Sequence, residues 1–342
     1  MARPTIRDLA QAAGVSVSTV NRVLGNAGTV RQATMQRVHA AAERIGFYGL
    51  GAIRSHVAAS RPKHRFGFLL QQPTRAWYRS LGQALEAAAA RIEDREIDVR
   101  IEFAADLSPQ HVASRLVALG DDCDAVGVVA AVHPLVKQAV ETLRQRGVPV
   151  FALISQLSAT GDVHYVGLDN WKVGRTAAWA FAHICRAPGK LGILVGNHRY
   201  RCQEMNESGF RSYFREFAPA FTLLEPLSTF ETAAIAEEMT ERLLREHPDL
   251  TGLFISGGGI TGAIAALRAS GRAGDLVAVG YEMMDATRTA LVDGVLTLVI
   301  AHPLARLAAE TIGGMIAAAP AAADAATRTV VLPFDIFTRE NI

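Results

Sequence analysis

The sequence contains little cysteine and no long apolar run, and each absence excludes a class of protein. Cys123, Cys185 and Cys202 include no CxxC pair and leave one cysteine over, so neither a disulfide framework nor a metal site is expected. The longest apolar stretches, such as residues 126–132, are far shorter than the roughly 20 residues of a membrane-spanning helix. Asp8 interrupts the stretch where a signal peptide would need its apolar core. We therefore expect a cytoplasmic protein that holds no metal and contacts no membrane.

Charge is distributed unevenly along the chain. Residues 1–65 carry ten Lys and Arg against two acidic residues, a net charge of +8, which leaves 25 basic and 31 acidic residues, a net charge of −6, for the remainder. A basic head on an acidic body indicates a polyanionic partner at the head, although a solvated basic surface would show the same charge. With 342 residues, half of them hydrophobic, the chain is long enough for two or three domains with cores of their own.

Two short helical patterns open the sequence. The first ends at Gly14, and Ser16 is a good N-cap for the second. Two helices joined by so short a turn predict a helix-turn-helix unit, whose second helix enters the major groove of DNA. A third amphipathic pattern, at residues 35–45, would close the small core. Apolar residues follow helical spacing at Ile6, Leu9, Ala10, Ala13, Val20, Val23 and Leu24.

The exposed face of the second helix has side chains that suit base edges. Arg22 can pair bidentately with guanine, Asn21 with adenine or a phosphate, and Val17 can touch a thymine methyl group. An ordinary helical hairpin with a polar outer face is the alternative. The expected contacts of the head with DNA are Thr5, Ser16, Val17, Ser18, Thr19, Asn21, Arg22 and Asn26.

The first 48 residues, with TIRDLAQAAGVSVSTVNRVLG and the later AAERIGF, resemble the DNA-binding domain of LacI-family transcriptional repressors. The resemblance implies a homodimer that binds a pseudo-palindromic operator in double-stranded DNA. Asn21 stands where the family usually has Ser, which bears on the operator sequence and not on the groove-reading role. An effector-responsive repressor, and not an enzyme, is therefore expected.

Residues 49–64 are small, basic and without a wide apolar face, so they predict a flexible linker in the absence of DNA. In the family this hinge segment forms a short helix on DNA and inserts an apolar side chain into the minor groove. Ile53 and Val57, four residues apart, resemble that pattern, and Val57 is the better candidate for the inserted side chain. A plain spacer is the alternative.

From residue 65 onward, β-branched runs alternate with helical patterns, which predicts α/β lobes with parallel sheets. This region resembles the family's effector domain, itself similar to periplasmic sugar-binding proteins. The expected fold is thus a small all-α helix-turn-helix domain (1–48), a hinge (49–64) and a two-lobed periplasmic-binding-protein-like domain (65–342). Its lobes would comprise residues 65–165 with 302–320, and residues 166–301 with 321–342. Strands are expected at 65–71, 97–104, 125–130, 148–154, 190–196, 221–227, 250–256, 276–281, 296–303 and 329–337.

Ligands of such folds sit at the carboxyl ends of the strands, in the cleft between the lobes. Trp77 and Tyr78 follow the first strand, where aromatic rings would stack on a sugar, unless they are core residues. Asp169 matches a family position that contacts ligand hydroxyls, and it is equally suited to cap a helix. The other expected effector contacts are Gln71, Gln72, Ser155, Arg201, Glu204, Ser256, Gly257, Glu282 and His302.

Several of these positions depart from the family's pattern. Ile154-Ser155 stands where sugar binders often have Asp-Arg, and Glu204 replaces a common Arg. Glu282 and His302 stand where Asp and Gln are usual. Because Glu204 removes a cation, an anionic effector is disfavoured unless Arg199 or Arg201 compensates. A sugar or polyol is expected, and an amine-bearing ligand is also compatible.

One motif favours a different class of protein. Residues 257–262, GGGITG, satisfy G-x-G-x-x-G between a strand and a helix, and Glu282 follows at the distance that an NAD site requires. An NAD(P)-binding enzyme is therefore the alternative function. The motif lies late in the second lobe, and no acid–base pair for hydride transfer is near it, so we expect no cofactor. A periplasmic binding protein is the other alternative, and it would need an export signal.

Overall fold

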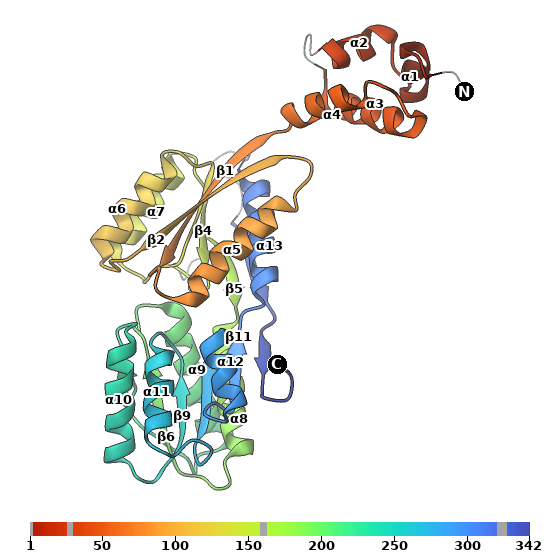
Figure 1. Cartoon of the computed structure of the whole chain (residues 1–342). Coiled ribbons are helices and arrows are strands. Elements are labelled where there is room, and N and C mark those ends of the chain that lie inside the picture. Colours follow the sequence, from red (N-terminus) through yellow and green to blue (C-terminus); the bar gives the residue numbers. More distant parts are fainter. Residues whose placement is uncertain (1–2, 26–29, 158–162, 320–326) are drawn as a thin grey trace. The chain divides into compact units, whose positions relative to one another are not determined.

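The computed structural model describes residues 3–25, 30–157, 163–319 and 327–342. The chain forms two compact units, one made of Met1–His64 with Ile92–Ile97, the other of Arg65–Arg91 with Asp98–Ile342. We refer to the helical part of the first unit as the head and to the second unit as the body (Figure 1).

The head contains four helices, α1 (Ile6–Ala13), α2 (Val17–Gly25), α3 (Gln32–Ile45) and α4 (Leu50–Ala59). Thr5 caps α1, because its backbone N–H donates to the Asp8 carboxylate at 2.8 Å and its hydroxyl accepts from the Asp8 N–H. Gly14 ends α1 in the left-handed conformation, with φ of 63°. Ser16 caps α2 by accepting from the Thr19 N–H at 3.2 Å. The predicted helix-turn-helix unit is confirmed.

The segment expected to be a flexible linker is instead the helix α4, which packs on the head. Ile53 is fully buried and joins the core residues of α1, α2 and α3, while Val57 is partly buried against them. The His56 ring donates to the Val23 carbonyl at 2.6 Å and so attaches α4 to α2. The head unit therefore extends past residue 48, and Ile53 faces its core, whereas the contact of Ile53 with DNA stays a prediction.

The body contains two sheets. The first has the strand order β12-β5-β4-β3-β1-β2, and the second has the order β13-β11-β10-β9-β6-β7, with β8 also beside β6. Their central strands pair in parallel, as predicted, and β13 runs antiparallel to β11. The strands are β1 (Lys63–Gln71), β2 (Glu96–Ala104), β3 (Ala125–Val128), β4 (Val150–Leu153), β5 (His164–Leu168), β6 (Lys190–Val195), β7 (Thr222–Leu223), β8 (Leu227–Ser228), β9 (Leu250–Ile255), β10 (Val277–Tyr281), β11 (Leu298–Ala301), β12 (Thr329–Leu332) and β13 (Asp335–Phe337).

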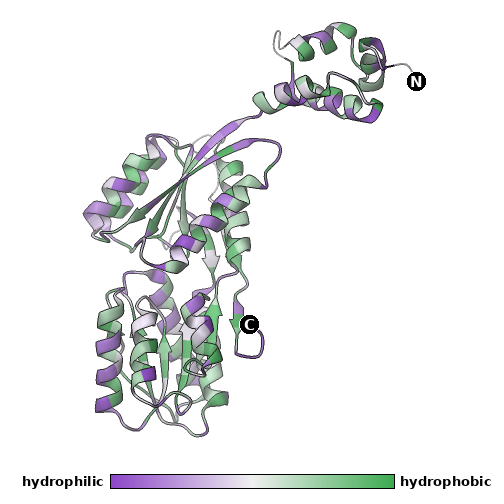
Figure 2. Cartoon of the chain, viewed as in Figure 1, coloured by the Kyte–Doolittle hydropathy of each residue, from purple (hydrophilic) through white to green (hydrophobic). Residues whose placement is uncertain are grey.

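Helices cover the sheets in neighbouring groups: α5 with α13, and α6 with α7, in the first lobe; α8 with α9, and α10 with α11 and α12, in the second (Figure 1). Figure 2 shows hydrophobic strands inside each lobe and hydrophilic stripes on the outer helices. Within the described residues, no helix is long and apolar enough to cross a membrane. The helices are α5 (Ala76–Ala90), α6 (Pro109–Gly120), α7 (Pro134–Gln145), α8 (Asn170–Ile184), α9 (Arg201–Phe217), α10 (Ala233–Glu246), α11 (Ile260–Ala269), α12 (Asp285–Val292) and α13 (Leu304–Ala318).

Two details of the expected lobes are wrong. The β5 strand, up to Leu168, belongs to the first sheet, and β12 pairs with it there, so 329–332 is not part of the second lobe. Pro333 ends β12 because proline has no N–H for the ladder, and the chain then crosses to the second sheet as β13. Pro226 likewise interrupts the strand expected at 221–227, which is divided into β7 and β8.

Because Ile53 is fully buried, Ile53→Ala should lower the free energy of unfolding of the head by about 2–5 kcal/mol. Hydrogen exchange of the α1–α3 amides in the full chain measures this change. Ser55→Ala, at an exposed position of the same helix, is the control and should change it by less than about 0.5 kcal/mol. Equal protection in the two variants would show that α4 is not part of the head core.

Candidate functional sites: the head helices and the interlobe pocket

The outer face of α2 is free to meet a partner. Val17 is 40% exposed, and Ser18, Asn21 and Arg22 are exposed as well, whereas Val20 on the opposite face lies in the core. Among the described residues, the Arg22 guanidinium makes two hydrogen bonds, both long at 3.4 Å, to the Ser18 carbonyl and the Thr19 hydroxyl. It therefore needs little energy to reorient toward a base edge. Asn26 lies outside the described residues.

A surface groove of about 670 Å³ runs beside α2. Its lining joins Val17 and Asn21 of α2 to the start of the chain and to Tyr48, which is 70% exposed. Tyr48 was not predicted, because its neighbour Phe47 is the core residue and only the structure shows that Tyr48 points outward. The groove is lined by Arg3, Pro4, Thr5, Ile6, Arg7, Val17, Asn21 and Tyr48.

In the body, the carboxyl ends of β1, β4, β9 and β10 meet at one pocket between the lobes, as their parallel order predicts. We call it the interlobe pocket. Its volume is about 50 Å³, room for one or two waters at roughly 30 Å³ each. Predicted residues that line it are Gln71, Trp77, Tyr78, Ser155, Ser256, Gly257 and Glu282.

The backbone is unusual at the strand ends around this pocket. Ile154 and Glu282, each the first residue after a strand, have φ of 69° and 72°, and Glu231 has φ of 61°. Left-handed conformations cost non-glycine residues about 1–3 kcal/mol and gather at functional sites. All three residues line the interlobe pocket.

An ion pair that the sequence analysis missed crosses the pocket. Arg75, just before α5 in the first lobe, donates to Glu231 in the second lobe at 2.8 Å. Gln71 accepts a second hydrogen bond from Arg75 at 3.0 Å, and Gln203 donates to the other Glu231 oxygen at 2.7 Å. Glu231 lies three residues after the end of β8, and this position near a strand end was the one feature of the sequence that could have identified it as a pocket residue. Tyr200, Tyr281 and Met284 are further lining residues that were missed.

Burial determines the protonation of this pocket. It raises the pKa values of Tyr78, Tyr200 and Tyr281 far above the usual tyrosine range, and that of the Cys202 thiol to about 12, so all four are neutral donors at physiological pH. Burial opposes the charge of Arg75, but the ion pair with the Glu231 carboxylate outweighs burial and raises the Arg75 pKa, which keeps the guanidinium charged.

The glycine-rich segment at residues 257–262 leaves space for the side chains of this ion pair network. A Cβ atom at Gly258 or at Gly196 would collide with the Glu231 carboxylate, and one at Gly257 would collide with the Gln203 side chain. The space that a dinucleotide phosphate would need is thus occupied by a carboxylate, whose charge also repels phosphate. The structure gives the G-x-G-x-x-G motif a role in packing and argues against the nucleotide alternative.

His302 hydrogen-bonds the Glu282 carboxylate from outside the pocket lining. The His302 ring Nδ1 and backbone N–H contact the two Glu282 carboxylate oxygens at 2.5 and 3.1 Å. The imidazole is buried between the rings of Trp77 and Tyr281, with both ring centroids 5.9 Å away. His302 is therefore a positioning residue for Glu282 and does not itself line the pocket.

Four predicted effector residues lie elsewhere. Asp169 caps α8 by accepting from the Lys172 N–H at 3.2 Å, and with Arg201 it lines a separate cavity of about 150 Å³. Glu204 is exposed, since the phase of α9 turns its neighbour Gln203 toward the pocket instead. Gln72 is not part of the lining either. The expectation that these side chains gather in the cleft is wrong for this conformation.

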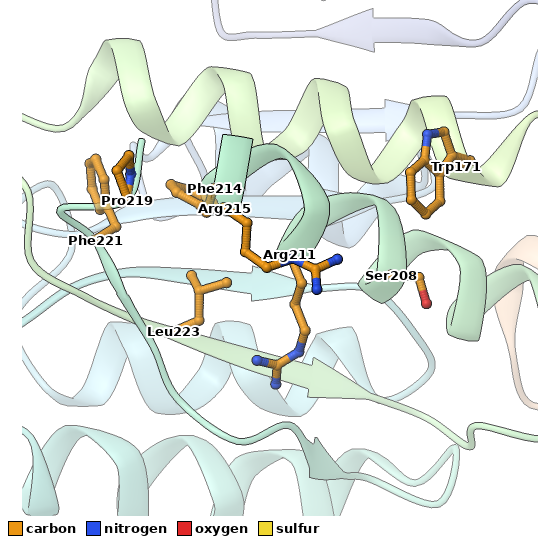
Figure 3. A pocket seen from close by; sticks show the side chains of 8 residues that line it. All are labelled: Trp171, Ser208, Arg211, Phe214, Arg215, Pro219, Phe221 and Leu223. Atoms are coloured by element: carbon orange, nitrogen blue, oxygen red, sulfur yellow. The ribbon is translucent and has the colours of Figure 1, made fainter. Parts of the chain in front are cut away.

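A larger groove, of about 610 Å³, lies on the second lobe along α9 (Figure 3). One of its two arginines, Arg211, already pairs with Glu207 at 2.7 Å. Its lining contains none of the residues that end or follow β1, β4, β9 and β10, so the interlobe pocket is the better candidate for a ligand site. Its lining is Trp171, Ser208, Arg211, Phe214, Arg215, Pro219, Phe221 and Leu223.

Two family models match the chain, one over the head and one over the body. The family described as bacterial regulatory proteins, lacI family, matches residues 5–49, and the periplasmic binding protein domain matches residues 66–319. The chain belongs to the periplasmic binding protein domain family, and it carries the DNA-binding domain of the lacI family at its N-terminal end. LacI-family regulators are DNA-binding proteins and not enzymes, so the NAD(P)-dependent alternative is excluded as the function.

Individual relatives are distant. The ribose operon repressor of Bacillus subtilis is 25% identical over 260 residues, 74% of this chain and 72% of that protein. A D-apiose import binding protein of Paraburkholderia graminis is 25% identical over 176 residues, 51% of this chain and 56% of that protein, so little more than half of that relative is matched. An ABC transporter solute binding protein from Burkholderia graminis, solved with D-arabinose, has the same fold, with a TM-score of 0.75, 15% identity, and coverage of 82% of this chain and 98% of that one.

Gly258→Ala should displace the Glu231 carboxylate and lower the free energy of unfolding of the body by about 1–3 kcal/mol, the usual cost of overpacking. Gly313→Ala is the matched control, because Gly313 is an exposed residue of α13 with open space around it. It should be neutral or stabilise by up to about 1 kcal/mol. Urea unfolding followed by circular dichroism compares the two, and a Gly258→Ala variant as stable as its control would contradict the role assigned to the glycine.

Proposed function

We propose that this LacI-family protein is a cytoplasmic transcriptional repressor whose affinity for DNA depends on a small polyhydroxylated effector. A homodimer would place the α2 helices of two heads in successive major grooves of a pseudo-palindromic operator. The observation that carries the proposal is a single chain that combines an exposed, weakly held Arg22 on α2 with a pocket where aromatic rings and hydrogen-bonding side chains converge.

Within the head, we assign base contacts to Val17, Ser18, Asn21 and Arg22, which share the exposed face of α2. Arg3 and Arg7, which line the same groove as Asn21, are placed to contact phosphates. The other polar positions expected at the DNA, Thr5, Ser16, Thr19 and Asn26, would contact the backbone. Val57 is the hinge residue left for the minor groove, because it is only partly buried whereas Ile53 is fully buried.

Within the body, Trp77 and Tyr78 would cover an apolar ring face, and Gln71, Ser155, Ser256 and Glu282 would bond hydroxyl groups. Relatives named for ribose and apiose support a sugar or a polyol as the effector class. Binding between the lobes changes their relative position and so biases the hinge, which couples the two sites.

Arg22→Ala should weaken binding to the operator by about 1–3 kcal/mol and relax specificity at one base pair. The operator is first selected from a random duplex pool with the purified protein, and fluorescence anisotropy then gives the affinities. Arg215→Ala, which also removes one positive charge but lies in the body, is the control and should bind as the wild type does. Unchanged affinity of the Arg22→Ala variant would refute the major-groove role of α2.

A thermal-shift screen of sugars and polyols, repeated as operator-binding assays, tests the effector. We expect a compound that stabilises the protein to lower its operator affinity. Higher operator affinity would make the compound a co-repressor and reverse the proposed direction of control. A stabilising compound with no effect on DNA binding would contradict the coupling of the two sites.

A further inference from the structure

The interlobe pocket is filled by one of the protein's own cations. The Arg75 guanidinium carbon lies 4.8 Å from the centroid of the Tyr78 ring, and the same group pairs with Glu231 at 2.8 Å. What remains open is about 50 Å³, whereas small-molecule pockets usually measure roughly 300–1,000 Å³. A ligand of sugar size therefore has to displace part of the lining, and the guanidinium lies where its ring would stack.

The two partners of this ion pair differ in how freely they can move. The Glu231 side chain is only 4% exposed, is fixed by Gln203, and fits between Gly196 and Gly258. The Arg75 side chain is 28% exposed and sits at the start of a helix, from which a long flexible side chain can turn outward. Opening the pocket therefore means that Arg75 leaves and Glu231 stays.

Departure of Arg75 leaves an anionic pocket. Glu231 would be buried without its ionic partner, which is strongly unfavourable unless the ligand brings a positive charge. Glu282, the other acidic residue of the lining, adds negative charge, and Arg75 is the one Lys or Arg that the described lining contains. A carboxylate opposite an aromatic face is an arrangement that binds ammonium and guanidinium groups well.

We propose that the pocket selects a cationic ligand, a polyhydroxylated compound with an ammonium or guanidinium group that takes the place of the Arg75 guanidinium between Tyr78 and Glu231. The inference rests on the proposed function in that the interlobe pocket is taken as the effector site. The same exchange breaks an ion pair between the lobes, so that ligand charge and lobe movement are linked.

Chemical rescue tests the cation site. Methylguanidinium at millimolar concentration should raise the Tm of the Arg75→Ala full chain, and neutral methylurea, of nearly the same shape, should not. Adding Glu231→Gln should weaken methylguanidinium binding by about tenfold or more, the effect of losing one charged hydrogen-bond partner. The wild type and Arg79→Ala, an exposed arginine of the same helix, should show no rescue.

Equal stabilisation by methylurea, no rescue, or rescue that persists with Glu231→Gln would overturn the proposal. If Arg75→Ala does not fold, the yield of folded protein on refolding with methylguanidinium against methylurea gives the same comparison. On the wild type, D-glucosamine should raise the Tm more than D-glucose, and glucamine more than sorbitol. A neutral compound that raises the Tm more than its amine counterpart would also overturn the proposal. If no member of a pair binds, the outcome of the Arg75→Ala rescue decides. None of these measurements uses DNA, so a failure of operator binding would refute the regulatory function and leave the cation site standing.

Discussion

The pocket between the lobes depends on one buried carboxylate, that of Glu231. A charge removed from water has to be matched by partners, and here Arg75 and Gln203 supply them from opposite lobes. The carboxylate also needs space, which Gly196 and Gly258 leave by having no side chain. The side chains and the glycines around the Glu231 carboxylate, although far apart in the sequence, are thus all needed to pair and to accommodate this one group.

In the head, the features that the sequence predicted are those with local causes. The end of α1 follows from Gly14, because glycine has no side chain and takes the left-handed conformation without strain, and the start of α2 follows from the hydroxyl of Ser16. The sequence indicated a helix in this segment only on DNA, and the packing of α4 on the head was not predicted, because the burial of Ile53 depends on a surface that the first three helices create together. Spacing within residues 49–64 carries no information about that surface.

In the body, the parallel strand order was enough to bring Gln71, Ser155, Ser256 and Glu282 to one place. The pair of Arg75 and Glu231 was beyond reach, since its members are 156 residues apart and neither belongs to a motif. The family position predicted Glu204 in the pocket, but Gln203 is there instead. A shift of one residue on a helix turns a side chain by about 100°, so Glu204 points away from the pocket.

The last two strands of the chain each form one edge of a sheet. β12 is the outermost strand of the first sheet and β13 that of the second, so the segment from Thr329 to Phe337 shields two sheet edges in succession. Uncovered edges offer rows of unpaired backbone groups to which further strands add. Proteolytic loss of this one segment would replace the largely exposed edge strands β12 and β13 by the buried, apolar strands β5 and β11, whose unpaired backbone would be more prone to pair with another chain.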